Sequence, residues 1–149
     1  MAAGPVSFRE GAGAGYVQGL GRLLKRLGRI PPEVRTDVRA TLENEASALV
    51  DDIKAVAPVA PEFERHPGEM RDSTHKQPGR HELAVQVVVD AKDEKGREYP
   101  PHVEYGHKTK AGGHVAAEPF FHPSVRRRKP KTRKAVSQAT SRGILKAWS

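Results

Sequence analysis

The feature that most constrains the fold is a long apolar stripe between Pro31 and Pro58. Apolar residues recur there at steps of three or four: Val34, Val38, Leu42, Ala46, Leu49, Ile53 and Val56. This spacing places one apolar face along a single helix. Because Pro31 and Pro32 suit a first helical turn and Pro58 disfavours helix in the preceding residue, we predict a helix over residues 33–57. A helix of about 37 Å needs a cover, either a sheet laid across it or a coiled-coil partner.

The sequence after this helix changes to the pattern of strands and turns. Residues 58–81 are rich in Pro and Gly and predict an extended connection, with a short strand near residues 71–76. Over residues 82–91, apolar positions alternate, which predicts a half-buried strand covered by the long helix. Residues 92–98 predict a turn. Residues 107–118 contain Gly112 and Gly113 and predict a hairpin tip or a mobile loop.

Both ends of the chain have their own patterns. Residues 1–15 alternate Gly and Ala and predict a flexible arm, whereas residues 16–27 predict a short amphipathic helix that ends at Gly28. A last helix is expected from near Ser124 to Trp148, broken or kinked at Pro130. The fold class is therefore α+β, with a long amphipathic helix packed on a small antiparallel sheet and a C-terminal helix. We divide the chain into an arm (1–15), an α+β domain (16–125) and a basic C-terminal helix or tail (126–149).

The apolar content predicts a thin core. Leu, Ile, Val and Phe number 30 of 149 residues, about one fifth, beside 14 Gly and 12 Pro. Such a chain is expected either to have long flexible arms or to complete its burial against copies of itself or a partner. The absence of Cys excludes disulfides, thiol nucleophiles and Cys-based zinc sites. The apolar runs are far shorter than the roughly 18 residues of a membrane helix, so we expect a soluble protein with no membrane partner.

The net charge of +8 comes from the end of the chain. Residues 126–149 contain nine Lys or Arg and no acid, whereas the other 125 residues carry 17 basic groups and 18 acids. The densest run consists of Arg126, Arg127, Arg128, Lys129, Lys131, Arg133 and Lys134. This run is either a solvated segment or a contact with nucleic acid or an acidic protein surface. Because no nucleic-acid-binding motif accompanies it, we expect no sequence readout.

Catalytic and metal-binding chemistry have little support in the sequence. His102, Glu104 and His107 form the tightest group of candidate metal ligands, but their spacing matches no helical zinc pair. Ser73 and Ser124 lack the sequence context of an activated nucleophile. We therefore expect no enzyme activity, cofactor or bound metal.

Four short segments, in order, resemble the head-tail joining and tail-completion family of tailed phages, which includes proteins similar to the lambda minor tail protein Z. They are the helix ending Ala55-Val56-Ala57-Pro58, the segment Gly68 to Ser73, Val103-Glu104-Tyr105-Gly106-His107, and Pro119-Phe120-Phe121-His122-Pro123 before a last helix. The order and spacing agree over residues 20–147. The chain departs from the family pattern at Met70, at His107 and in the longer connection over residues 59–67.

The motif residues have structural rather than catalytic explanations. Gly68 and Gly106 suit sharp turns with positive φ. Phe120 and Phe121, set between Pro119 and Pro123, anchor the last helix either in the chain's own core or in a neighbouring subunit. Glu104 is either a solvated acid or the partner of a neighbour's Arg. We take Glu104, Tyr105, Gly106, Phe120, Phe121 and Pro123 as family-motif or subunit-interface residues.

The resemblance implies a structural virion protein in the phage neck. It implies a ring, expected to be a hexamer, between the head connector or stopper and the tail tube or terminator, with genomic DNA passing through the lumen. The location would be the virion, and the host cytoplasm during assembly. The alternatives are a tail terminator ring that caps the tail tube, a non-virion basic nucleic-acid-binding module, and a metal-dependent enzyme around His102, Glu104 and His107.

Overall fold

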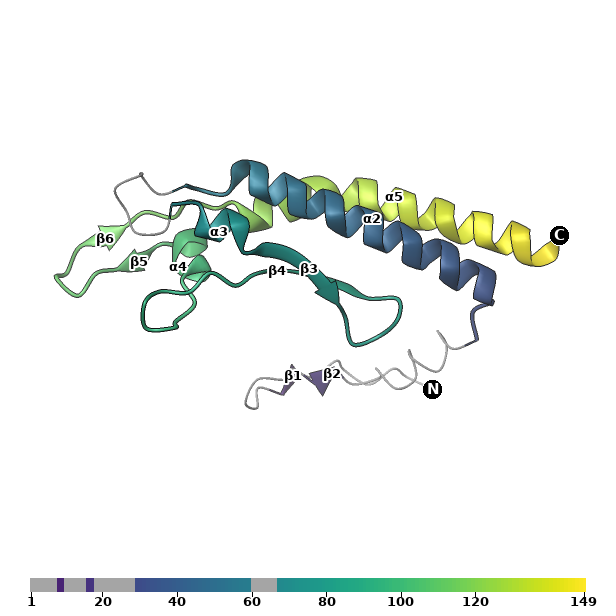
Figure 1. Cartoon of the computed structure of the whole chain (residues 1–149), viewed down its shortest axis with the longest axis horizontal. Helices are drawn as coiled ribbons and strands as arrows, with labels where there is room; N and C mark the ends of the chain where they lie inside the picture. Colours follow the sequence, from purple (N-terminus) through teal and green to yellow (C-terminus); the bar gives the residue numbers. More distant parts are fainter. Residues whose placement is uncertain (1–7, 10–15, 18–28, 60–66) are drawn as a thin grey trace.

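The computed structural model describes residues 8–9, 16–17, 29–59 and 67–149 (Figure 1). Strands β1 (Phe8–Arg9) and β2 (Tyr16–Val17) form an antiparallel pair. The predicted helix over residues 16–27 therefore does not begin at residue 16, because its first two residues belong to a strand. Its remainder, its end at Gly28, most of the predicted arm and residues 60–66 of the predicted connection lie outside the described residues.

Two long helices run side by side in opposite directions and make up the largest part of the fold (Figure 1). Helix α2 (Pro32–Val56) confirms the predicted helix, with a Pro in its first turn and Ala57 donating its N–H to the Ile53 carbonyl at 2.8 Å. Helix α5 (Phe121–Trp148) begins three residues before the predicted Ser124. The stripe on α2 is thus covered partly by a helix of the same chain.

Pro130 does not break α5, so the break, one of the two outcomes predicted for this proline, does not occur. A proline inside a helix removes one N–H and its bond to the carbonyl four residues earlier, at a cost of about 3 kcal/mol. Both Pro130 and Arg126, whose carbonyl loses its partner, are exposed, so water can take the place of the missing donor. Packing of the opposite face of α5 against α2 holds the helix together.

The two helices approach each other closely near the start of α2. A Cβ built on Gly143 of α5 would lie 2.5 Å from the Val34 Cα atom, so only a glycine allows this spacing. Val34, Val38 and Ala139 form a small buried cluster at this crossing. The sequence pattern of α5 therefore places its smallest residue where the backbones meet.

A β-hairpin covers the other side of α2, which confirms the predicted α+β fold class. Strands β3 (Thr74–Pro78) and β4 (Val85–Val89) pair antiparallel, with Thr74 opposite Val89 and Pro78 opposite Val85. The short helix α3 (Glu69–Asp72) precedes β3, so the strand predicted near residues 71–76 begins later than expected. The strand predicted over residues 82–91 is confirmed in its centre.

The larger core cluster lies where α2, the hairpin and the start of α5 meet. Its buried members are Ile53, Ala57, Met70, Ala91 and Phe120. Phe120 is only 2% exposed, and Val87 and Val89 of β4 pack against the cluster. Phe120 therefore anchors α5 in the chain's own core, which decides between the two roles expected for it.

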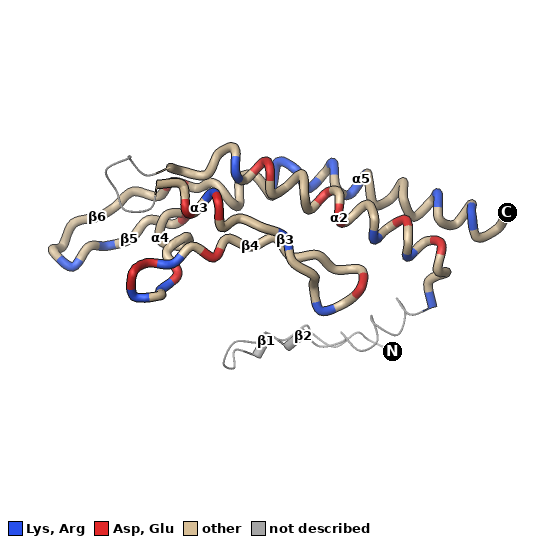
Figure 2. The backbone as a smooth tube through the Cα atoms, in the orientation of Figure 1, with Lys and Arg blue, Asp and Glu red and all other residues tan. Residues whose placement is uncertain are grey.

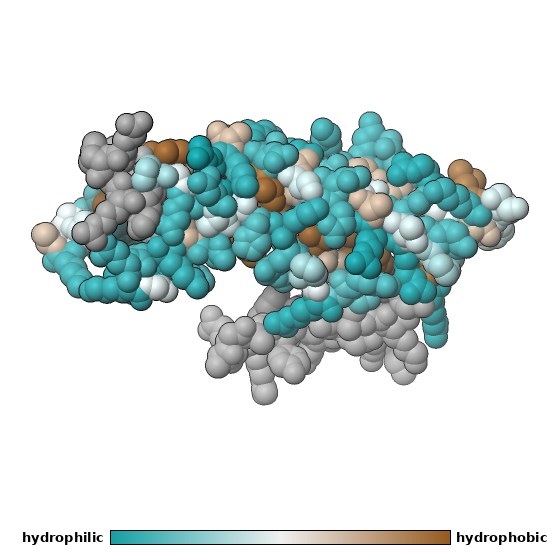
Figure 3. All heavy atoms as spheres, in the orientation of Figure 1, coloured by the Kyte–Doolittle hydropathy of each residue, from teal (hydrophilic) through white to brown (hydrophobic). Residues whose placement is uncertain are grey.

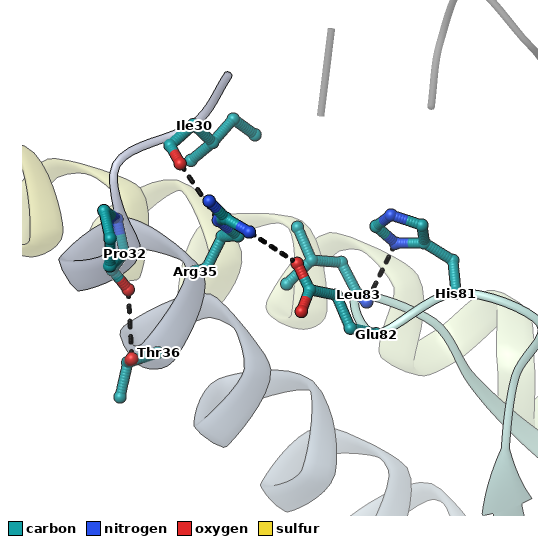
Figure 4. Close-up of polar contacts among 7 residues, drawn as sticks. All are labelled: Ile30, Pro32, Arg35, Thr36, His81, Glu82 and Leu83. Atoms are coloured by element: carbon teal, nitrogen blue, oxygen red, sulfur yellow. Dashed lines mark hydrogen bonds and ion pairs between the residues drawn. The ribbon is translucent and has the colours of Figure 1, made fainter. Parts of the chain in front are cut away.

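The turn of the hairpin is tied to the start of α2 (Figure 4). The Arg35 guanidinium donates from Nε to the Ile30 carbonyl at 2.9 Å and pairs with the Glu82 carboxylate at 3.2 Å. The Leu83 N–H donates to Nδ1 of His81 at 3.0 Å, and Thr36 donates to the Pro32 carbonyl. Of these contacts, the Arg35–Glu82 pair joins the hairpin turn to α2, at the end opposite the larger core.

Candidate functional site

The two most distinctive sequence motifs meet in one place, where helix α4 (Pro100–Tyr105) lies beside the start of α5. The sequence reasoning missed α4. The adjacent prolines 100 and 101 were the available signal, because proline is favoured in a first helical turn. We call the contact between α4 and the first turn of α5 the α4–α5 joint.

Glu104 holds this joint together. Its Oε2 accepts the backbone N–H groups of Phe120 at 2.8 Å and Phe121 at 2.9 Å, and its Oε1 accepts that of His122 at 3.0 Å. The first N–H groups of any helix lack partners within the helix, and a carboxylate there also complements the helix dipole. Since Phe120 at the N-cap position has no side-chain acceptor, Glu104 supplies the cap from another element.

This geometry replaces both roles expected for Glu104. The residue is 6% exposed, so it is not a solvated surface acid. Both carboxylate oxygens are used within the chain, so a neighbour's Arg is not needed to satisfy it. The role was missed because a cap 16 residues away from its helix leaves no local sequence pattern.

The environment of Glu104 favours the ionised form. Burial is the largest single effect and raises the pKa of the carboxyl group. The hydrogen bonds from Phe121, Phe120 and His122, with a smaller contribution from the charge of His122, together outweigh burial and leave the pKa below the ordinary 4.5. The joint therefore carries a buried negative charge held by a helix start.

The residues around Glu104 complete the joint. The chain leaves α4 at Gly106, whose φ of +71° confirms the positive φ expected there, as does the +83° of Gly68. A Cβ on Gly106 would lie 2.7 Å from the Val115 carbonyl oxygen. Beyond this corner, β5 (His107–Lys108) and β6 (His114–Val115) form the predicted hairpin. Tyr105, 67% exposed, contacts Nε2 of His122 through its hydroxyl at 2.6 Å.

A mostly apolar cavity of about 280 Å³ opens beside the joint. Its lining comes from β4, α4 and the first turn of α5: Val88, Val89, Glu98, Pro100, Pro101, Glu104, Tyr105, Phe120, Phe121 and His122. We call it the joint cavity. Five of the six motif residues taken from the sequence lie at or beside it, and Pro123, exposed in the first turn of α5, follows directly.

The basic run lies on α5 rather than in a separate tail (Figure 2). The exposure of its side chains divides it into two groups. Six members are exposed: Arg126, Arg127, Lys129, Lys131, Arg133 and Lys134. Arg128 instead turns toward α2, where NH1 lies 2.7 Å from Asp52 and Nε lies 3.3 Å from Glu45. Its side chain is 12% exposed, so Arg128 is part of the packing and not of a partner-binding surface.

The histidine group considered as a metal site has a different arrangement. His102 and His107 stack edge to face with ring centroids 5.3 Å apart, while Glu104 is engaged with α5. Over residues 29–59 and 67–149 there is no group of three or more His, Asp or Glu side chains able to hold a metal ion. Within the same ranges, every helix is too short or too polar to cross a membrane.

Comparison of the chain with protein-family models, with curated proteins and with solved structures returned no match.

Proposed function

We propose that this chain is a structural protein of a tailed-phage neck that joins head and tail. The observation that carries the proposal is the α4–α5 joint. Two motifs of the family resemblance, 103–107 and 119–123, are separate in sequence, yet Glu104 of the first caps the helix that begins within the second. This contact gives the order and spacing of the motifs a physical reason, which supports the resemblance and the neck role that it implies.

The surface of the chain also suits an assembly role. Over residues 29–59 and 67–149 the core consists of two small clusters, while Tyr105, Leu145 and Trp148 are large apolar or aromatic side chains that are 67–87% exposed. Exposed groups of this kind mark surfaces that bind other proteins. The exposed basic residues of α5 suit either the DNA in the lumen or an acidic face of an adjacent ring.

The test uses the encoding phage with this gene deleted and the chain supplied from a plasmid. Arg126, Arg127 and Lys134 are changed to Glu, and Arg128 is left intact because it pairs with Asp52 and Glu45 inside the fold. We expect folded protein but separate heads and tails in electron micrographs. The matched control carries Lys95→Glu, Lys108→Glu and Lys110→Glu, the same charge change at exposed sites away from α5. Joined, infectious particles from the deletion itself would overturn the proposal.

The same preparations separate the tail terminator role from head-tail joining. A terminator binds the end of the tail tube and stops its growth, so its loss gives tails of uncontrolled length. A joining protein leaves tails of normal length without heads. Measuring tail length in the deletion therefore distinguishes the two roles.

The exposed basic face of α5 favours a second candidate, a nucleic-acid-binding module with no virion role. Contacts with several phosphates make log affinity fall with log salt at a slope of about 0.9 per phosphate on duplex DNA. Filter binding to duplex DNA, measured between about 50 and 200 mM salt, tests this candidate. A slope near zero favours the neck role. A steep slope, together with normal particles from a phage that lacks the gene, favours the nucleic-acid-binding module.

A further inference from the structure

We propose that the end of α5 on one copy of this chain inserts into the joint cavity of a second copy. The inference rests on the proposed function, because it assigns the contact between neighbouring subunits of the proposed ring. The inserting surface consists of Ile144, Leu145 and Trp148, which we call the α5 tip.

The α5 tip presents large apolar side chains to solvent. Ile144, Leu145 and Trp148 are 46%, 71% and 87% exposed, and their spacing of three and four residues places them on one side of the helix. Figure 3 shows apolar residues near this end of α5 among otherwise polar surface. Such a group gains free energy when another surface removes it from water.

The joint cavity has the size and chemistry to receive one of these side chains. Its volume of about 280 Å³ exceeds the roughly 150 Å³ of an apolar cavity that binds benzene. Val88, Pro100 and Phe121 provide apolar walls, and Tyr105 at the edge offers an exposed ring for contact with an indole. The cavity therefore fits Trp148, with Leu145 against its edge.

The α5 tip cannot reach the cavity of its own chain. The cavity lies at the first turn of α5 and Trp148 lies 27 residues later, which corresponds to about 40 Å along the helix axis. Figure 1 shows α4 and the C-terminal end of α5 at opposite ends of the elongated molecule. Only a second copy can bring the two together. A contact between two different patches repeats from copy to copy and closes into a ring when the rotation permits.

Charge favours the same pairing. Glu98 is exposed and lines the cavity, which also contains the buried Glu104 carboxylate. Arg142 and Lys146 flank the tip, and α5 carries no acidic residue. Lys146 pairs with Asp37 of its own chain at 2.9 Å, so Arg142 supplies the positive charge that a neighbouring copy meets. The tip of one copy therefore brings positive charge toward the negative side of the next, which selects this orientation over tip-to-tip contact.

The absence of Cys allows a direct test by disulfide trapping. One variant carries Pro101→Cys on the cavity lining and another carries Ser149→Cys beside Trp148, so that the tip itself is unchanged. After mixing and oxidation, we expect disulfide-linked dimers between the two variants, at least tenfold above a mixture of Pro101→Cys with Ser137→Cys, which is exposed in the middle of α5. Adding Trp148→Ser to the second variant should abolish the link, with circular dichroism showing that the fold is kept.

Cross-linking no greater than in the Ser137→Cys mixture, or cross-linking that Trp148→Ser does not reduce, would overturn the inference. A wild-type chain that light scattering finds monomeric up to millimolar concentration would also overturn it. Capture of a different protein or of a small apolar ligand in the cavity, with no link between copies, would do the same. If the link fails but deletion of the gene separates heads from tails, the neck role stands without this contact. If the link forms but the deletion has no effect on particles, the contact stands and the neck role falls.

Discussion

The carboxylate of Glu104 accepts the backbone N–H of Phe120 at 2.8 Å, which ties helix α4 to the residue that precedes helix α5. Phe120 is buried against Ile53 and Met70, while Glu104 closes the start of α5 above it. Phe120 is thus held by the apolar packing of its side chain and by the hydrogen bond from its backbone N–H to the Glu104 carboxylate. The position of α5 depends on both.

Removing the Glu104 charge should destabilise the protein. Glu104→Gln keeps one acceptor but turns an amide N–H₂ toward a donor, and we expect a loss of about 1–2 kcal/mol in the free energy of unfolding. Glu104→Ala leaves three N–H groups without this acceptor and should cost about 3 kcal/mol. Urea unfolding followed by circular dichroism measures both. Glu118→Gln, an exposed acid two residues before Phe120, is the matched control and should change little.

The lowered pKa of Glu104 predicts a loss of stability in acid. A group whose pKa is lower in the folded protein contributes its full stabilisation above its unfolded value, which is ordinarily 4.5, and loses it as the pH falls through the lower folded value. Unfolding free energies measured from pH 6 to pH 2, which brackets the ordinary carboxyl range, should fall more steeply in the wild type than in Glu104→Gln. Parallel curves for the two proteins would show that Glu104 does not supply this pH dependence.

Within the basic run, Arg128 packs between α5 and α2, whereas the other members are exposed on the surface. Its guanidinium pairs with Asp52 and Glu45 between α5 and α2, so Arg128→Ala removes the cation from two acids of α2, of which Glu45 keeps its hydrogen bond from Thr132. We expect a loss of about 2 kcal/mol in the free energy of unfolding. Arg127→Ala, one residue earlier and exposed, should change it by less than about 0.5 kcal/mol. Equal effects of the two substitutions in thermal or urea unfolding would contradict the division of the run.

Local patterns predicted the elements of this chain better than its contacts. The stripe from Val34 to Val56 fixed helix α2, and the alternation around Val87 fixed β4, because each face is set by periodicity within one segment. The partners of Glu104 and Arg128 lie 16 and 76 residues away, and no periodicity encodes such pairs. The joint cavity could not be found for the same reason, since three elements contribute to its wall.

Gly106 should tolerate no side chain. Its φ of +71° is nearly the same as the +72° of Gly96. A Cβ on Gly106 would lie 2.7 Å from the Val115 carbonyl oxygen, whereas a Cβ on Gly96 would have no neighbouring atom within 4 Å. Gly96→Ala carries only the conformational cost of about 1–2 kcal/mol. Gly106→Ala should cost at least about 1 kcal/mol more, because the hairpin of β5 and β6 must move. Similar melting temperatures for the two variants would show that the corner can relax.

Gly143 tests how closely α2 and α5 must approach. In an exposed helix, replacing Gly by Ala stabilises by about 1 kcal/mol, so helix propensity alone favours Gly143→Ala. A Cβ there would lie 2.5 Å from the Val34 Cα and 2.9 Å from its backbone N, so the helices must separate. Because backbone atoms cannot rotate away as a side chain does, we expect a net loss of about 1–3 kcal/mol. Ser137→Ala, on the exposed side of the same helix, is the control and should be neutral or slightly stabilising. A Gly143→Ala variant with a higher urea midpoint than the wild type would mean that the spacing of the helices is set elsewhere.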